Sequence, residues 1–158
     1  MNKNKILSGL LIFGLGIATF IIVAIGIQLV PLSFATAKAN PEIAHMRVPV
    51  LIMAWFILAC ILAIVVLAVA LFGRIIKNKV FEQKSVSLLK AMGISSLVPI
   101  PVLIALVFYT MNNVAGSITN LWAFFGIMVC VMASIFFFLI SSLFQNAVDY
   151  KTENELTV

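Results

Sequence analysis

Four long apolar stretches without a charged residue dominate this sequence. They cover about residues 6–30, 48–73, 92–111 and 121–144. Each reaches the roughly 20 residues that an α-helix needs to cross the hydrocarbon core of a bilayer. Their apolarity is continuous and does not alternate with period two, which favours helices over barrel strands. The sequence therefore predicts an all-α membrane protein, a bundle of four transmembrane helices in the lipid bilayer.

The composition excludes most soluble classes of protein. Hydrophobic residues make up 64% of the chain and charged residues only 9%, against about 45–50% and about 25% in soluble domains. Soluble enzymes, disordered regulators and direct nucleic-acid binding are therefore not expected. No loop is long enough to form a second domain, so residues 1–158 are expected to form a single membrane domain.

The first stretch has some features of a secretory signal peptide. Lys3 and Lys5 precede it, and Ala35-Thr36-Ala37 resembles a cleavage site. Its apolar run, however, exceeds the roughly 7–15 residues of a signal core. We therefore expect it to be retained as a spanning helix.

The basic residues predict the orientation of the helices. Eight of the ten lie before the first stretch, in the central loop 74–91 or in the tail 145–158, and only Lys38 and Arg47 lie on the other side. The positive-inside rule then places both termini and the central loop in the cytoplasm. The eight are Lys3, Lys5, Arg74, Lys77, Lys79, Lys84, Lys90 and Lys151.

Few residues are suited to chemistry within the bilayer. All five acids lie in loops or in the tail, which disfavours proton-coupled transport. Cys60 and Cys130 lie apart in apolar runs and are expected to be packing residues. The single histidine, His45, has no nucleophile or metal-binding partner beside it in sequence. We predict no catalytic residue, no metal site and no cofactor.

Small residues at four-residue spacing predict close helix packing. Ordinary packing within the chain is the expected role, and a homodimer seam is the alternative. The spacings are Gly14–Ala18, Ala59–Ala63 and Gly126–Cys130–Ser134.

The third stretch contains two prolines and follows an amphipathic segment. Pro99 and Pro101 are expected to kink or locally unwind the helix. Before them, Val86, Leu89 and Gly93 share one helical stripe. A basic amphipathic turn of this kind is expected to lie flat on anionic lipid, and a docking surface for a cytoplasmic protein is the alternative.

The tail has the opposite charge from the central loop. This segment contains one basic residue, Lys151, and three acidic residues, Asp149, Glu153 and Glu155. An acidic tail is expected to project into the cytoplasm or to pair with the basic loop. Its end, Leu156-Thr157-Val158, is either a docking peptide or disordered.

Parts of the loop and tail resemble a known family. Asn78-Lys79-Val80-Phe81, then Leu88-Leu89 and Gly93, and the ending Glu153-Asn154-Glu155-Leu156-Thr157-Val158 resemble the YoaS-like group of uncharacterised four-helix bacterial membrane proteins. One departure is Glu82, where the family often has a helix-capping threonine or serine. The next helix is therefore expected to start differently, at Glu82 or at Ser85.

The resemblance implies a regulatory role without enzymatic activity. Members of the group are commonly encoded beside a small helix-turn-helix regulator, which implies that the loop and tail bind such a protein. The alternative is a small transporter, channel or immunity-type protein that acts within the bilayer. The expected partner-binding residues are Lys77, Asn78, Lys79, Phe81, Lys84, Leu88, Glu153, Glu155 and Leu156.

Overall fold

The computed structural model describes residues 3–77, 79–114 and 116–156, and its elements there are helical. Four helical segments are long and apolar enough to span a membrane, which confirms the all-α prediction and indicates a multi-pass membrane protein. They are Ile6–Ala39, Pro41–Ile76, Gln83–Asn113 and Ile118–Glu153. The elements are α1 (Lys3–Ala39), a 3₁₀ helix η1 (Pro41–Met46), α2 (Arg47–Ile76), α3 (Gln83–Leu97), α4 (Pro99–Asn113) and α5 (Ile118–Leu156).

The helices continue well beyond the apolar stretches. α1 passes through Pro31 and ends at Ala39, although the apolar stretch ends near residue 30. Within the expected central loop 74–91, only the connection 77–82 lies between helices, and the expected tail is part of α5 up to Leu156. A helix satisfies its own backbone hydrogen bonds inside and outside lipid, so a change from apolar to polar residues does not end it.

The third span is divided at Val98, immediately before the prolines that were expected to disturb it. α3 ends at Leu97 and α4 begins at Pro99. Pro99 and Pro101 lack the N–H groups that would continue the helical hydrogen bonds. Val98 keeps helical dihedral angles (φ −58°, ψ −37°), so α4 continues across the membrane from α3.

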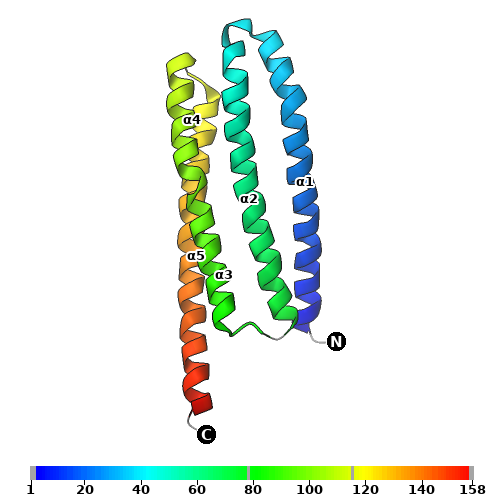
Figure 1. The fold of residues 1–158 in the computed structure, drawn as a ribbon, viewed down its shortest axis with the longest axis vertical. Helices are drawn as coiled ribbons and strands as arrows, with labels where there is room; N and C mark the ends of the chain where they lie inside the picture. The colour runs from blue at the N-terminus through cyan, green and yellow to red at the C-terminus, as the bar shows by residue number, and fades with distance from the viewer. Residues whose placement is uncertain (1–2, 78, 115, 157–158) are drawn as a thin grey trace.

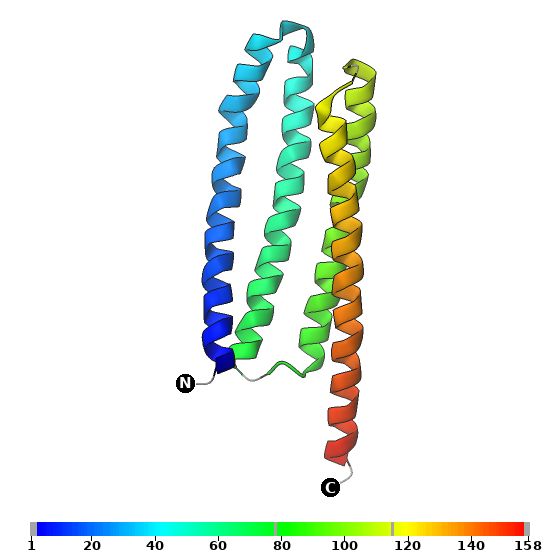
Figure 2. The same ribbon diagram turned by 180° about the vertical axis from the view of Figure 1, so that it is seen from behind.

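The bundle is open on the side of α1 (Figures 1 and 2). α1 and α2 form a hairpin, α2 packs against α3 and α4, and both of these pack against α5. α1 packs chiefly against α2, so most of its apolar side chains are exposed to the surroundings. The start of α1, the connection 77–82 and the end of α5 lie at one end of the molecule, and η1 lies at the other. We call these the loop end and the outer end.

Two apolar clusters hold the helices together. Near the loop end, α2 contributes Ala68 and Leu71, and α3 contributes Leu89 and Met92. Near the outer end, three α4 residues pack with Ala123 of α5. They are Leu103, Leu106 and Val107.

The amphipathic stripe of α3 is buried within the protein. Val86 is fully buried and Leu89 is 3% exposed, and the cluster around Leu89 includes residues of α2 and α5. The expectation that this segment lies flat on lipid is therefore wrong. Its apolar face is covered by two helices of the same chain, a contact that periodicity cannot distinguish from a contact with lipid.

The small residues have different roles in different helices. A Cβ atom at Gly126 would lie 3.5 Å from the Leu103 side chain, so this spacing brings α5 close to α4. A Cβ atom at Gly14 would meet nothing within 4 Å. Internal packing is therefore confirmed at Gly126, whereas Gly14 lies on an open face of α1.

Candidate functional site

The loop end gathers the residues that the sequence suggests for partner binding. We define the loop–tail surface as the connection 77–82, the first turn of α3 and the last turns of α5 from Gln145. Lys77, Lys79 and Lys84 are exposed there, as is Glu153 on α5. Phe81 is 52% exposed. The surface therefore combines basic, acidic and aromatic side chains at one end of the protein.

Some of the suggested residues are placed differently or are not described. Leu88 is half-buried and packs against the apolar cluster beneath the surface, so it supports the surface from within. Asn78 lies outside the described residues, and so do the side chains of Glu155 and Leu156.

Arg74 fixes the path of the connection. From the last turns of α2 its guanidinium forms an ion pair with Glu82. Its Nε donates a hydrogen bond to Ser85 Oγ at 3.0 Å, and Ser85 Oγ in turn donates to the carbonyl oxygen of Lys79 at 3.3 Å. Ser85 is fully buried, and the Arg74 side chain is only 17% exposed. One partly buried guanidinium therefore joins α2 to Glu82 of the connection and to Ser85 of α3.

The structure shows where the helix after Glu82 begins. α3 begins at Gln83, and Glu82 stands at the N-cap position with extended backbone (φ −129°, ψ 151°). Its side chain makes no capping hydrogen bond and pairs with Arg74 instead. The sequence did not indicate this pair, because Arg74 and Glu82 are eight positions apart and residues that pair on one helix are three or four apart. In the sequence, Arg74 served only to predict the orientation of the helices.

Contacts between α3 and α5 join the loop to the tail. Gln83 and Gln145 exchange amide hydrogen bonds of 3.0 and 3.2 Å, and Gln145 Nε2 donates to Asp149 Oδ1 at 2.9 Å. The rings of Phe81 and Phe144 lie 5.9 Å apart between centroids. α5 is thus helical through the tail and attached to α3 and the connection by amides and an aromatic contact. The charge pairing expected between the acidic tail and the basic loop is not among these contacts.

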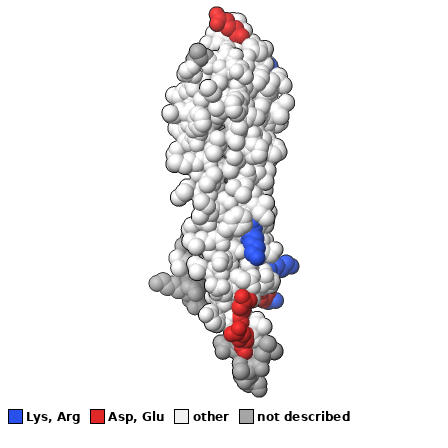
Figure 3. All heavy atoms as spheres, turned by 90° about the vertical axis from the view of Figure 1, so that its left-hand side faces the viewer, with Lys and Arg blue, Asp and Glu red and all other residues white. Residues whose placement is uncertain are grey.

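Charge is concentrated at the ends of the molecule. Figure 3 shows one face on which blue and red side chains lie near the loop end and a red patch lies at the outer end, with no charge over the length between. That uncharged length corresponds to the apolar spans. Blue and red side chains both lie near the loop end in this view, so a partner would meet both signs of charge there.

Comparison with protein families assigns the chain to one family. A family model described as "Protein of unknown function (DUF2975)" matches residues 31–158. The chain belongs to this family. The DUF2975 region begins at Pro31, inside α1, and includes α2 to α5 with the whole loop–tail surface. No curated protein and no solved structure matches the chain.

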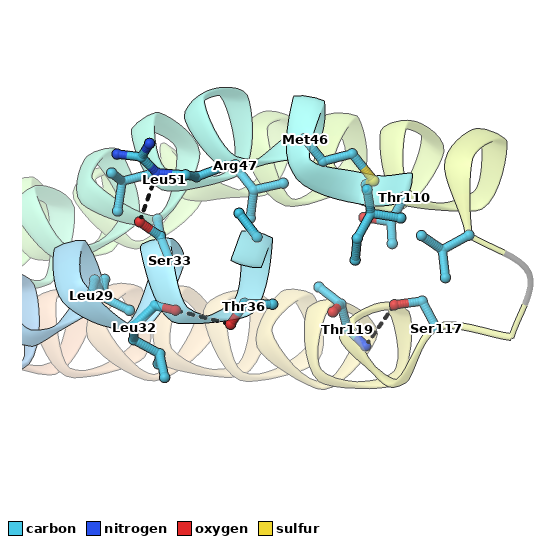
Figure 4. Close-up of a pocket in the computed structure, with 15 residues that line it drawn as sticks. Leu29, Leu32, Ser33, Thr36, Met46, Arg47, Leu51, Thr110, Ser117 and Thr119 are labelled. Carbon is cyan, nitrogen blue, oxygen red and sulfur yellow. Dashed lines mark hydrogen bonds between the residues drawn. The ribbon is translucent and has the colours of Figure 1, made fainter. Parts of the chain in front are cut away.

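The DUF2975 region also contains a second feature, which the sequence did not reveal. A cavity of about 410 Å³ lies at the outer end, lined by residues of α1, η1, α2, α4 and the start of α5 (Figure 4). Arg47 lines it. The only sequence signal for it was that Arg47 is one of two basic residues on this side, because the other lining residues are spread along the chain and come together only in the fold.

Proposed function

We propose that this DUF2975 protein is a multi-pass protein of a bacterial cell membrane that binds a small cytoplasmic helix-turn-helix transcription regulator. In this proposal both termini and the connection 77–82 lie in the cytoplasm, and the protein itself has no enzymatic activity. A regulator held at the membrane is depleted from its operator, so binding and release would control transcription.

One observation carries the proposal. α5 continues as a helix to Leu156, past the level of the connection, and its Gln145 is hydrogen-bonded to Gln83 of α3. A charged helix that extends beyond the span and is fixed to a basic segment offers a preformed protein-binding surface. The carboxylates of Asp149 and Glu153 suit the basic DNA-binding face of a helix-turn-helix protein. The resemblance to the YoaS-like group supports the choice of partner.

The proposed orientation predicts the pattern of chemical labelling in cells. In a variant with Cys60 and Cys130 replaced by serine, a cysteine introduced by Lys79→Cys should react with a membrane-impermeant maleimide only after the membrane is opened. A cysteine introduced by Glu42→Cys should react in intact cells, because η1 would lie outside. Labelling of Lys79→Cys in intact cells would contradict the proposed orientation.

Binding of the regulator provides the direct test. The full-length protein in detergent should bind a small helix-turn-helix regulator of the kind that the YoaS-like resemblance implies. A deletion of residues 149–158 should weaken this binding about tenfold or more, because it removes the carboxylates proposed to meet the basic face. Lys77→Glu/Lys79→Glu/Lys84→Glu should weaken it about as much, because in this proposal the lysines meet acidic groups elsewhere on the regulator and so set its register on the surface.

The matched control is Lys38→Glu, which reverses an exposed charge at the outer end. It should leave the affinity unchanged. If the triple variant and the deletion both bind as tightly as the parent protein, the loop–tail surface is not the binding site.

The alternative function, a small transporter, channel or immunity-type protein, is favoured by the outer-end cavity. A substrate path would have to continue from this cavity to the loop end. Between them lies the apolar cluster that contains Leu71, Leu89 and Met92. Flux through vesicles that contain the purified protein would support this alternative over the regulatory proposal.

A further inference from the structure

The outer-end cavity has an apolar wall and a small polar part. About 410 Å³ is within the range of small-molecule sites, roughly 300–1,000 Å³, and toward its lower limit. Leu29, Leu51 and Ala54 line the part that lies deeper in the spans. The Arg47 guanidinium lies beside Leu51 and Ser33, and most of the other hydroxyl groups lie farther toward the outer end of the cavity (Figure 4). The hydroxyl-bearing residues are Ser33, Thr36, Thr110, Ser117 and Thr119.

Three of these five hydroxyl groups are already committed as donors. Thr36 Oγ1 donates to Leu32 O at 2.9 Å, and Thr110 Oγ1 donates to Leu106 O at 2.7 Å. Ser33 Oγ donates to Val30 O at 2.7 Å. Each of these three hydroxyl groups donates its only hydrogen to a helix carbonyl. Its oxygen then offers only lone pairs to a ligand, and lone pairs cannot bind an anion.

Arg47 is the cationic donor among the residues that line this cavity. The guanidinium is half-buried, with Cζ 3.2 Å from the centroid of the Phe34 ring, and its Nε donates to Ser33 Oγ at 3.3 Å. No ion pair joins Arg47 to an acid within the described part of the chain. A guanidinium has five N–H donors, and one hydrogen bond leaves the others for a ligand. A half-buried cation without a counter-charge favours an anionic group beside it.

We propose that the outer-end cavity binds a single-chain amphiphile with a carboxylate head, such as a medium-chain fatty acid. The carboxylate binds the guanidinium of Arg47, and the hydrocarbon chain lies against Leu29, Leu51 and Ala54. The limited volume favours one short chain over a two-chain phospholipid. The site lies at the end of the protein opposite the loop–tail surface, so it stands independently of the regulator proposal.

The test uses the full-length protein in phosphatidylcholine nanodiscs, without any regulator, and radiolabelled decanoate as the probe. Binding above that of empty nanodiscs should be saturable. Arg47→Gln should weaken it about tenfold, because one charge-assisted hydrogen bond contributes roughly 1.5 kcal/mol or more. Radiolabelled decanol, which has the same chain and no charge, should bind equally to the parent protein and to Arg47→Gln.

Lys38→Gln is the matched control, because it removes an exposed cation near the end of α1 that does not line the cavity. Equal loss of decanoate binding in Lys38→Gln and Arg47→Gln would overturn the proposal, as would the absence of saturable binding. Loss of decanol binding in Arg47→Gln would also overturn the assigned role of the guanidinium. Nanodiscs of phosphatidylglycerol test the other source of an anionic head. If this lipid abolishes saturable decanoate binding, the occupant is an anionic phospholipid and the single-chain assignment is wrong.

Discussion

Replacing Gly93 with leucine is expected to lower the melting temperature of the detergent-solubilised protein by roughly 5 °C. A Cβ atom at Gly93 would lie 3.1 Å from the Phe138 ring, where α3 crosses α5. The branched end of leucine needs still more space, and overpacking of this kind costs about 1–3 kcal/mol. The gain in helix propensity over glycine is about 0.8 kcal/mol and only partly offsets this cost.

Gly14→Leu is the matched control for Gly93→Leu. It adds the same side chain to α1, where a Cβ atom would meet nothing within 4 Å. Only the propensity gain acts there, so its melting temperature should stay the same or rise. Adding Phe138→Ala to Gly93→Leu should recover part of the loss, because the ring that causes the clash is removed. Equal melting temperatures for Gly93→Leu and Gly14→Leu would show that the α3–α5 contact tolerates a larger side chain.

Arg74→Gln is expected to loosen the connection 77–82 and to lower the free energy of unfolding by about 1–3 kcal/mol. The substitution removes the cation from Glu82 and a hydrogen-bond donor from Ser85, whose side chain is fully buried. Hydrogen–deuterium exchange should become faster at the amide of Lys79, which donates to the carbonyl oxygen of Arg74 at 2.9 Å, and at Ser85, whose amide donates to Glu82 O at 2.9 Å.

Lys77→Gln is the control for this prediction, since it removes an exposed cation three residues further along. It should change neither the hydrogen–deuterium exchange rates of these amides nor the free energy of unfolding. A double-mutant cycle with Glu82→Gln then isolates the ion pair, whose coupling energy should be at most about 1 kcal/mol because Glu82 is 43% exposed. Identical exchange rates in Arg74→Gln and Lys77→Gln would mean that Arg74 does not fix the connection.

The two predictions concern contacts that the sequence revealed to different degrees. The stripe of Val86, Leu89 and Gly93 was visible as a helical period, and the structure buries each of these residues. The period shows which side of a helix is apolar, but it does not show which neighbour covers that side. The contact of Gly93 with Phe138 therefore became visible only when α5 was placed.

The loop–tail surface was predicted in part. The position of the exposed lysines follows from the charge pattern, because charged side chains stay out of the hydrocarbon. The amide pair of Gln83 and Gln145 does not follow, since it joins residues 62 positions apart. The ion pair of Arg74 with Glu82 was missed as well, because each residue was read for a local role in orientation or capping.

Three properties of this protein follow from the sequence alone: it is helical, four of its segments are able to span a membrane, and its charges lie outside the apolar lengths. These properties depend on the preference of each segment for lipid or water, which is local. The open side of the bundle beside α1, the attachment of α5 to α3 and the cavity that Arg47 lines with residues of four helices and η1 became visible only in the folded chain. The reason is physical: between segments that are equally apolar, packing shape and a few polar contacts choose the neighbours, and these depend on residues distant in sequence.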